Sequence, residues 1–305
     1  MTPDRIIVLS GPTASGKSGL ALALAREFPV EIVNADSLQV YRYLDIGTAK
    51  PTVPERREVP HHLIDVADPD EAYDAGRYVR EAERAIGEIR SRGKVPLVAG
   101  GTGMYIRALL RGLDPLPADP RVREELSRRW ESEGGAALHA ELARIDPETA
   151  ARVHPSDRLR VVRAMEIAAV AGIPPSRARA AWRSAGAGRG RLFLALRPDR
   201  ETVYRRIDAR TEEMFRRGLT EEVRGLLARG FDRSLKPMMA LGYRHTVAHL
   251  LDGVPLPETI DAVKRDTRRY AKRQLTWLSS EPNLVHIVPG DEPRRTGEIV
   301  RIYLS

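Results

Sequence analysis

The stretch RIIVLSGPTASGKSGLALALAREF, residues 5–28, contains an apolar run, a glycine-rich turn and an amphipathic segment, in that order. The turn fits the phosphate-loop pattern G-x-x-x-x-G-K-[ST] at Gly11, Gly16, Lys17 and Ser18. In such a loop, backbone N–H groups of the turn and of the following helix N-terminus converge on phosphate oxygens. The pattern predicts a strand, a phosphate loop and a helix, with Lys17 as a cation and the Ser18 hydroxyl as an Mg²⁺ ligand.

Further apolar runs follow at residues 31–36, 95–101 and 192–197, and a weaker one at 283–288. Short apolar runs separated by helical patterns are typical of buried parallel strands in a doubly wound α/β domain. We therefore expect an α/β fold with a parallel sheet core like that of the P-loop NTPases, in which residues 283–288 add an edge strand.

The segment between the third and fourth predicted strands is too long for one crossover connection. It begins with the proline-rich stretch 113–120 and ends with the glycine-rich stretch 184–190. Between them, residues 122–145 and 156–172 have apolar side chains at the i, i+3 and i+4 spacing of helices.

This pattern predicts a small all-helical domain, residues 114–186, inserted into the α/β core. The core would consist of residues 1–113 and 187–305, and would end in C-terminal helices that include a basic one at about 258–279.

Composition limits the classes of function. There is no cysteine, which excludes disulfides, thiolate metal sites and cysteine nucleophiles. No apolar run is long enough to cross a membrane, and the N-terminus has no signal-peptide pattern, so we expect a cytoplasmic enzyme. The formal net charge of +8 indicates either a polyanionic partner such as nucleic acid or a biased use of arginine.

The identity of the bound phosphate depends on carboxylates near the loop. An ATPase or GTPase uses an acidic residue at the end of a later strand to hold Mg²⁺, but Thr102 stands there, in AGGTGMY. Asp36, which ends the second strand, is the only carboxylate that the topology places against the loop. It could accept a proton, hold a metal ion or cap the turn that begins at Ser37.

Seven motifs together resemble one family, the tRNA dimethylallyltransferases or tRNA isopentenyltransferases. They are GPTASGKS, NADSLQVYRYLDIGTAKP, HHLIDVADPDEAYDAGRYV, VAGGTGMYIRALL, HPSDRLRVVRAMEIA, LGYR and AKRQLTWL, and they cover nearly the whole chain. The resemblance implies that the phosphate loop binds the diphosphate of dimethylallyl diphosphate. It further implies transfer of the dimethylallyl group to N6 of the adenosine 3′ to the anticodon of tRNA.

The resemblance also implies roles for single residues. Asp36 would take the proton from the adenine amine, while Lys17, Arg210 and Mg²⁺ on Ser18 would stabilise the leaving pyrophosphate. Thr102 would bind phosphate or orient the amine. The diphosphate-binding residues would be Gly11, Thr13, Ala14, Ser15, Gly16, Lys17 and Ser18. The residues themselves give no reason to prefer Arg210 over Arg206 or Arg217.

Basic and polar side chains elsewhere predict contacts to RNA, because Arg and Lys bind phosphates and amides and aromatics bind bases. By resemblance, Gln39 is expected to contact adenine and Tyr243 to stack on a base. Tyr270 and Trp277 at helical spacing fit a core position better than a stacking one, and His61 and His62 fit a structural role better than a metal site. The predicted tRNA-binding residues are Asp36, Ser37, Leu38, Gln39, Arg160, Arg163, Tyr243, Arg244, Arg269 and Arg273.

Three other functions fit part of the sequence. A small-molecule kinase would share the phosphate loop but would not use the basic helices. An adenylate isopentenyltransferase, which prenylates free AMP, ADP or ATP, would not need the charged insertion. An RNA-binding module without activity would not use the phosphate loop, Asp36 or Thr102. The resemblance favours the tRNA-modifying enzyme, which we expect to be a monomer.

Overall fold

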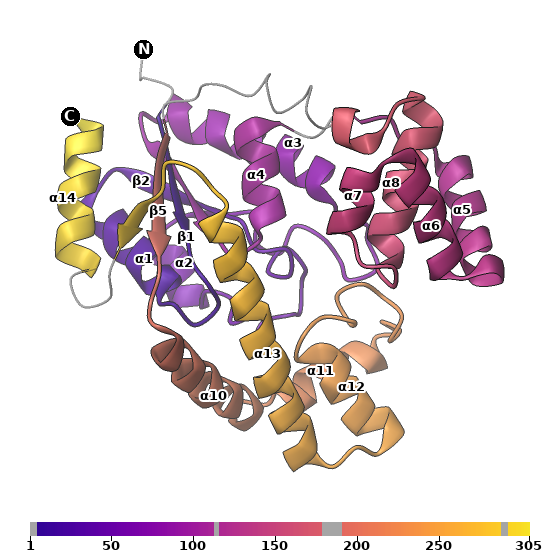
Figure 1. Ribbon diagram of the computed structural model, residues 1–305. Coiled ribbons are helices and arrows are strands. Elements are labelled where there is room, and N and C mark those ends of the chain that lie inside the picture. Colours follow the sequence, from indigo (N-terminus) through magenta and orange to yellow (C-terminus); the bar gives the residue numbers. More distant parts are fainter. Residues whose placement is uncertain (1–4, 113–115, 179–190, 288–291) are drawn as a thin grey trace. The chain divides into compact units, whose positions relative to one another are not determined.

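The computed structural model describes residues 5–112, 116–178, 191–287 and 292–305 (Figure 1). The chain divides into a core unit, Met1–Leu110 with Arg189–Ser305, and a helical unit, Arg111–Gly188. The borders predicted from the sequence, 113/114 and 186/187, lie outside the described residues.

A six-stranded sheet forms the centre of the core unit. Its strands are β1 (Ile6–Ser10), β2 (Val30–Asn34), β3 (His61–His62), β4 (Val95–Gly100), β5 (Arg191–Leu196) and β6 (Val285–Ile287). They are all parallel, in the order β3-β2-β4-β1-β5-β6. The predicted α/β fold and the predicted edge strand β6 are confirmed, and residue 288 of that prediction lies outside the described residues.

The order of the strands explains where a ligand binds. After β1 the chain forms β2 two places away on one side, and β4 later fills the place between them. β5 pairs with the opposite edge of β1. Ligands of open parallel sheets bind at the carboxyl ends of the strands, where the direction of winding changes. The segment that follows β1 at this point is the phosphate loop.

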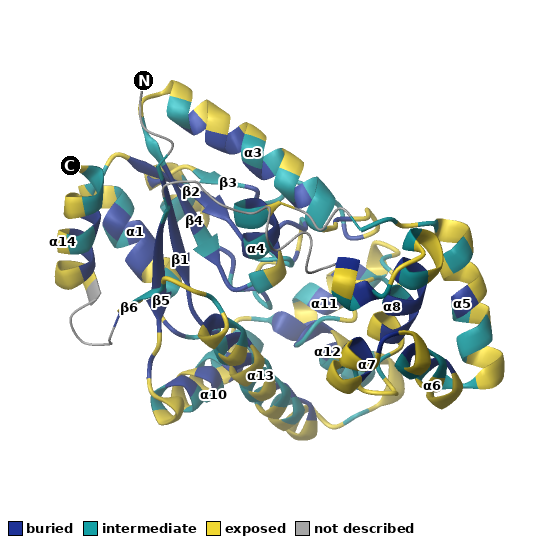
Figure 2. Cartoon of the chain, turned by 45° about the horizontal axis from the view of Figure 1, so that its top comes forward, coloured by how far each residue is buried: buried dark blue, intermediate teal, exposed yellow. Residues whose placement is uncertain are grey.

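Helices cover both faces of the sheet (Figures 1 and 2). Ile7 and Leu9 of β1 belong to an apolar cluster with α1 and α14, while Ile6 and Val8 face a second cluster that includes α3 and α4. This alternation follows from the two-residue period of a strand. The helices of the core unit are α1 (Lys17–Glu27), α2 (Val53–Glu58), α3 (Ala75–Ser91), α4 (Gly103–Arg111), α10 (Arg200–Arg216), α11 (Leu219–Ala228), α12 (Tyr243–Asp252), α13 (Leu256–Ser279) and α14 (Glu292–Leu304).

The helical unit contains α5 (Pro120–Glu133), α6 (Gly135–Ile145), α7 (Pro147–Arg152) and α8 (Arg158–Ala171). They share an apolar core around Leu138, Leu142 and Val161, as the all-helical prediction requires. The predicted helical region 122–145 forms two helices, because the backbone at Gly134 has φ +85°, a conformation that ends α5.

Among the helices of the described residues, none is both long and apolar enough to cross a membrane.

Candidate active site

The phosphate loop curves between β1 and α1 as the sequence pattern predicts. Ala14 and Gly16 adopt positive φ values of 60° and 92°, and such turns direct successive N–H groups toward one point. The Ser15 hydroxyl is buried and has no hydrogen-bond partner within the part of the chain that the structure describes. A buried hydroxyl without a partner fits a loop whose partner is a bound anion.

Two cations lie beside this loop with little compensating charge. Burial lowers the pKa of Lys17 to about 8, an effect that the Asp36 carboxylate partly opposes. Burial also lowers the pKa of Arg210, and Asp36 again opposes the shift. Cations held in a site that disfavours their charge are expected where a polyanion binds.

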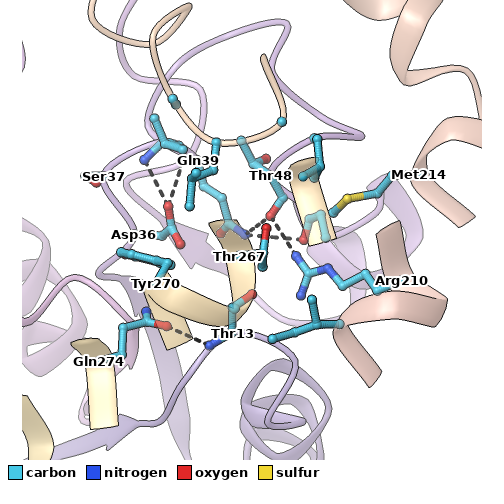
Figure 3. A pocket seen from close by; sticks show the side chains of 18 of the residues that line it. Thr13, Asp36, Ser37, Gln39, Thr48, Arg210, Met214, Thr267, Tyr270 and Gln274 are labelled. Carbon is cyan, nitrogen blue, oxygen red and sulfur yellow. Dashed lines mark hydrogen bonds between the residues drawn. The ribbon is translucent and has the colours of Figure 1, made fainter. Parts of the chain in front are cut away.

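The geometry separates Arg206 and Arg210 of α10 and Arg217, which directly follows that helix, although the sequence left the three equivalent. Arg206, Arg210 and Arg217 all line a cavity on the outer side of the phosphate loop. Only Arg210 also lines the larger cavity that contains Asp36. Its guanidinium donates to the Thr48 carbonyl at 3.4 Å (Figure 3). Arg210 is therefore the arginine of α10 that reaches both sides of the loop.

The larger cavity, about 610 Å³, lies entirely within the core unit. Its wall combines phosphate-loop residues with the turn after β2 and with one face of α13 (Figure 3). Apolar side chains complete it: Leu38, Ile207, Met214, Met239, Leu241 and Val263. The cavity thus offers an anion site and an apolar surface next to each other.

Asp36 performs the capping role that the sequence left open. Its Oδ1 accepts hydrogen bonds from the backbone N–H groups of Leu38, at 2.9 Å, and Gln39, at 3.4 Å. The Asn34 Oδ1 accepts a hydrogen bond from the backbone N–H of Asp36 at 3.1 Å. The carboxylate also lines the cavity, and the hydrogen bonds of the cap fix its orientation there. This position is compatible with a role in proton transfer.

Thr102 follows β4 and supports the same turn. Its hydroxyl accepts from the Ser37 N–H at 2.9 Å and donates to the Ser37 hydroxyl at 3.3 Å. Ser37 lines the cavity, as do Leu38 and Gln39. The structure therefore places Thr102 one contact behind Ser37, and its role toward phosphate or amine stays a prediction.

Gln274 on α13 is a site residue that the sequence reasoning missed. Its Oε1 accepts from the phosphate-loop N–H of Thr13 at 2.8 Å (Figure 3), and its Nε2 donates to the Gly101 carbonyl at 3.0 Å. The buried amide thus links α13, the phosphate loop and the turn after β4. The sequence signal that could have identified Gln274 is its position within AKRQLTWL.

Basic side chains from α12 and α13 line the cavity. Arg244 and Arg269 both bond to Asp266, at 2.7 and 3.2 Å, and Arg273 lies over the Tyr270 ring. Arg269 and Arg273 have exposed positions, as expected for residues that contact RNA. Tyr270 also lines the cavity, so its predicted position in the core is wrong.

Several predicted roles need correction. Tyr243 is fully buried and its hydroxyl donates to Glu222 at 2.7 Å, so the prediction that it stacks on a base is wrong. The Gln39 amide donates to the Thr48 and Ala49 carbonyls, at 3.1 and 3.3 Å, so its NH₂ group is used within the protein.

In the helical unit, Arg163 donates to the Leu116 and Pro117 carbonyls and to Glu166. These contacts give it a structural role, against the predicted phosphate contact. Arg160 differs, because its side chain is 71% exposed and lies 3.4 Å from Asp157.

The remaining predictions concern residues outside the cavity. His61 bonds to the Val59 carbonyl and His62 to Glu31, which confirms their structural role. Trp277 packs against Phe193 and against Gly103, where any Cβ would come within 2.3 Å of the indole. Its predicted core position is confirmed.

The described residues contain no group of three or more His, Cys, Asp or Glu side chains that could hold a metal ion by themselves. Mg²⁺ commonly binds through one or two protein oxygens together with substrate phosphates. The exposed position of Ser18 at the start of α1 and the Asp36 carboxylate in the cavity fit that kind of site.

The fold and the site define a phosphate-loop α/β protein whose cavity joins an anion site to an apolar and basic wall. The family model described as "IPP transferase" matches residues 39–281, and the one described as "Isopentenyl transferase" matches residues 4–65. The chain belongs to the IPP transferase family.

Relatives agree over almost the full length. The tRNA dimethylallyltransferase of Desulfosudis oleivorans is 50% identical over 94% of this chain and 91% of its own. A tRNA isopentenylpyrophosphate transferase from Bacillus halodurans superposes with a TM-score of 0.73 at 35% identity, covering 99% of this chain and 97% of its own. A eukaryotic dimethylallyltransferase, described as acting on tRNA, gives 0.79 at 29% identity, covering 97% and 77%.

Proposed function

We propose that this protein transfers a dimethylallyl group from dimethylallyl diphosphate to N6 of the adenosine 3′-adjacent to the anticodon of tRNA. The products are N6-isopentenyladenosine and pyrophosphate. The observation that carries the proposal is the single cavity that contains Lys17, Asp36 and Arg210 together with an apolar wall and the arginines of α12 and α13. Its relatives and structural neighbours are tRNA dimethylallyltransferases and isopentenyltransferases.

In the donor half of the reaction, the phosphate loop binds the diphosphate. The bond between the allylic carbon and the diphosphate oxygen breaks, and the electron pair leaves with the pyrophosphate. Lys17, Arg210 and the loop N–H groups stabilise that charge as it develops. The Ser18 hydroxyl would hold Mg²⁺ here, and the ion would supply further positive charge to the leaving group.

In the acceptor half, the adenine N6 attacks the allylic carbon and loses one proton. The lone pair of an exocyclic adenine amine is delocalised into the ring, so a proton acceptor is needed within hydrogen-bond reach. Asp36 supplies it, in an orientation fixed by the N–H groups of Leu38 and Gln39. The base reaches this depth only after it leaves the stack of the anticodon loop.

A direct test uses mass spectrometry of an anticodon stem-loop RNA that carries an adenosine 3′ to the anticodon. The RNA is incubated with the enzyme, Mg²⁺ and dimethylallyl diphosphate, or with ATP in a parallel reaction. We expect one added C5H8 unit on that adenosine, and none with ATP. Unmodified RNA would contradict the proposal, and prenylation of free AMP, ADP or ATP instead would indicate an adenylate isopentenyltransferase.

The role of Asp36 has its own test. Asp36→Asn keeps a side chain of similar shape but removes the proton acceptor, so we expect kcat to fall about 10³-fold. Asp261→Asn on the exposed face of α13 is the control. Near-normal turnover of Asp36→Asn together with a loss of Mg²⁺ dependence would assign the carboxylate to the metal instead.

The proposal includes the predicted cytoplasmic location and the predicted monomer. Analytical ultracentrifugation of the enzyme with and without the stem-loop RNA tests this part.

A further inference from the structure

Glu222, on α11, lies outside both cavities and belongs to none of the motifs used above. Its carboxylate accepts hydrogen bonds from three consecutive backbone N–H groups, those of Asp45 at 2.9 Å, Ile46 at 2.6 Å and Gly47 at 3.1 Å. The buried hydroxyl of Tyr243 donates a fourth, at 2.7 Å. One partly buried side chain therefore holds the start of the loop 45–49.

The same loop is packed closely on Tyr243. A Cβ at Gly47 would come within 2.6 Å of the Tyr243 ring, so only glycine allows this approach. Ala49, at the other end, has φ +47°. Hydrogen bonds to a charged group and close packing together give this loop one conformation.

The end of the loop reaches the site. The Thr48 carbonyl accepts from the Gln39 amide at 3.1 Å and from the Arg210 guanidinium at 3.4 Å (Figure 3). Gln39 belongs to the acceptor side of the cavity, whereas Arg210 belongs to the diphosphate side. A single carbonyl is thus a shared partner of residues on both sides.

We propose that Glu222 is a positioning residue that fixes the loop 45–49, so that the Thr48 carbonyl sets the placement of Gln39 and Arg210 together. The inference rests on the proposed function, because that function defines the diphosphate side and the acceptor side of the cavity. It also gives Tyr243 a role: the buried hydroxyl completes the contacts of the Glu222 carboxylate.

The test measures binding and turnover separately. Glu222→Gln replaces a carboxylate by an amide whose NH₂ group faces backbone N–H groups, and Tyr243→Phe removes one hydroxyl. Glu221→Gln is the matched control, because Glu221 is the adjacent residue of α11 and its side chain is 67% exposed. Calorimetry gives the affinities for Mg²⁺ with inorganic pyrophosphate and for the stem-loop RNA, and thermal unfolding identifies the folded variants.

We expect Glu222→Gln to weaken both affinities about tenfold, the factor that corresponds to a lost hydrogen bond to a charged group. Tyr243→Phe should weaken both by about threefold, and Glu221→Gln by less than about twofold. kcat at saturating substrates should fall less than the affinities do, because Glu222 touches no reacting atom.

A folded Glu222→Gln enzyme with either affinity unchanged would overturn the inference. If that variant does not fold, Tyr243→Phe and Gly47→Ala decide, since each disturbs the same loop from a different side. The proposed function is judged independently, by whether the wild-type enzyme adds C5H8 to the RNA. Each proposal can therefore fail without affecting the test of the other.

Discussion

The two sides of the cavity are built differently. The diphosphate side comes from one continuous segment, residues 11–18, whose backbone conformation directs N–H groups to a point, and from Arg210 of α10 beside it. The acceptor side comes from three distant segments: the turn after β2, α12 and α13. The turn of the loop is set by the backbone conformation of neighbouring residues, whereas the acceptor side depends on long-range contacts.

Those contacts can be named. Gln274 ties α13 to the phosphate loop, and the Thr48 carbonyl joins Gln39 to Arg210. Ion pairs from α10 to α13, such as Glu212 with Lys264 at 2.6 Å, hold the helix that carries most of the acceptor side. The difference indicates that substitutions in the phosphate loop should impair the reaction of the diphosphate donor alone. Substitutions that remove the long-range contacts should weaken the binding of both substrates.

The largest expected effect separates Arg210 of α10 from Arg217, which directly follows that helix. Arg210→Met should lower kcat/KM about 10²-fold, because a preorganised cation beside the leaving group is lost. Arg217→Met removes the same charge from a residue that lines only the outer cavity, and it should cost less than about threefold. Steady-state kinetics with dimethylallyl diphosphate measures both, and equal losses would contradict the distinction drawn from the geometry.

The second prediction concerns pH on the diphosphate side. Burial lowers the pKa of Lys17 to about 8, so without ligand its charge is lost as pH rises through 8. Affinity for inorganic pyrophosphate should then fall by up to about tenfold per pH unit above 8. In Lys17→Arg the guanidinium stays charged throughout this range, so calorimetry should find no such step. The same slope in both enzymes would assign the dependence to another group.

The third prediction removes the long-range contact made by Gln274. Gln274→Leu leaves the Thr13 N–H and the Gly101 carbonyl without a partner, which should destabilise the protein by about 1–3 kcal/mol. Because the amide joins the two sides, KM for both substrates should rise about fivefold in the folded variant. Lys272→Leu, at an exposed position of the same helix, is the control. A change in only one KM would indicate that α13 does not link the sides.

The smallest effect concerns the helical unit. If Arg160 contacts RNA phosphate, Arg160→Ala should reduce the slope of log affinity against log salt by about 0.7. Arg163→Ala should leave that slope unchanged, because its guanidinium is bonded to Leu116, Pro117 and Glu166. Filter binding of the stem-loop at several salt concentrations tests the pair, and a reversed order would restore the original prediction for Arg163.

The same contrast explains what could be predicted from the sequence. The phosphate loop, the strands around it and Asp36 were recognisable because each signal lies within a few consecutive residues. Gln274 bonds to a backbone group 261 residues away, and Glu222 bonds to one 176 residues away, so no local pattern marks either residue. Tyr243 was misjudged because a tyrosine has the same sequence signal whether its ring is buried or exposed.

The glycines after β4 also limit what this protein could become. A Cβ at Gly100 would come within 2.2 Å of the Ala35 carbonyl oxygen, and one at Gly101 within 2.4 Å of the Gln274 amide. Glycine to aspartate is the shortest mutational route to an acidic strand end of the kind that nucleotide hydrolases use for their metal ion. Backbone atoms of Ala35 close Gly100 to that change, and at Gly101 the Gln274 side chain would have to move; the neighbouring Thr102 hydroxyl already holds Ser37. Evolution toward ATP hydrolysis from this scaffold would therefore have to move the backbone at Ala35 or give up the contact of Gln274 with Gly101.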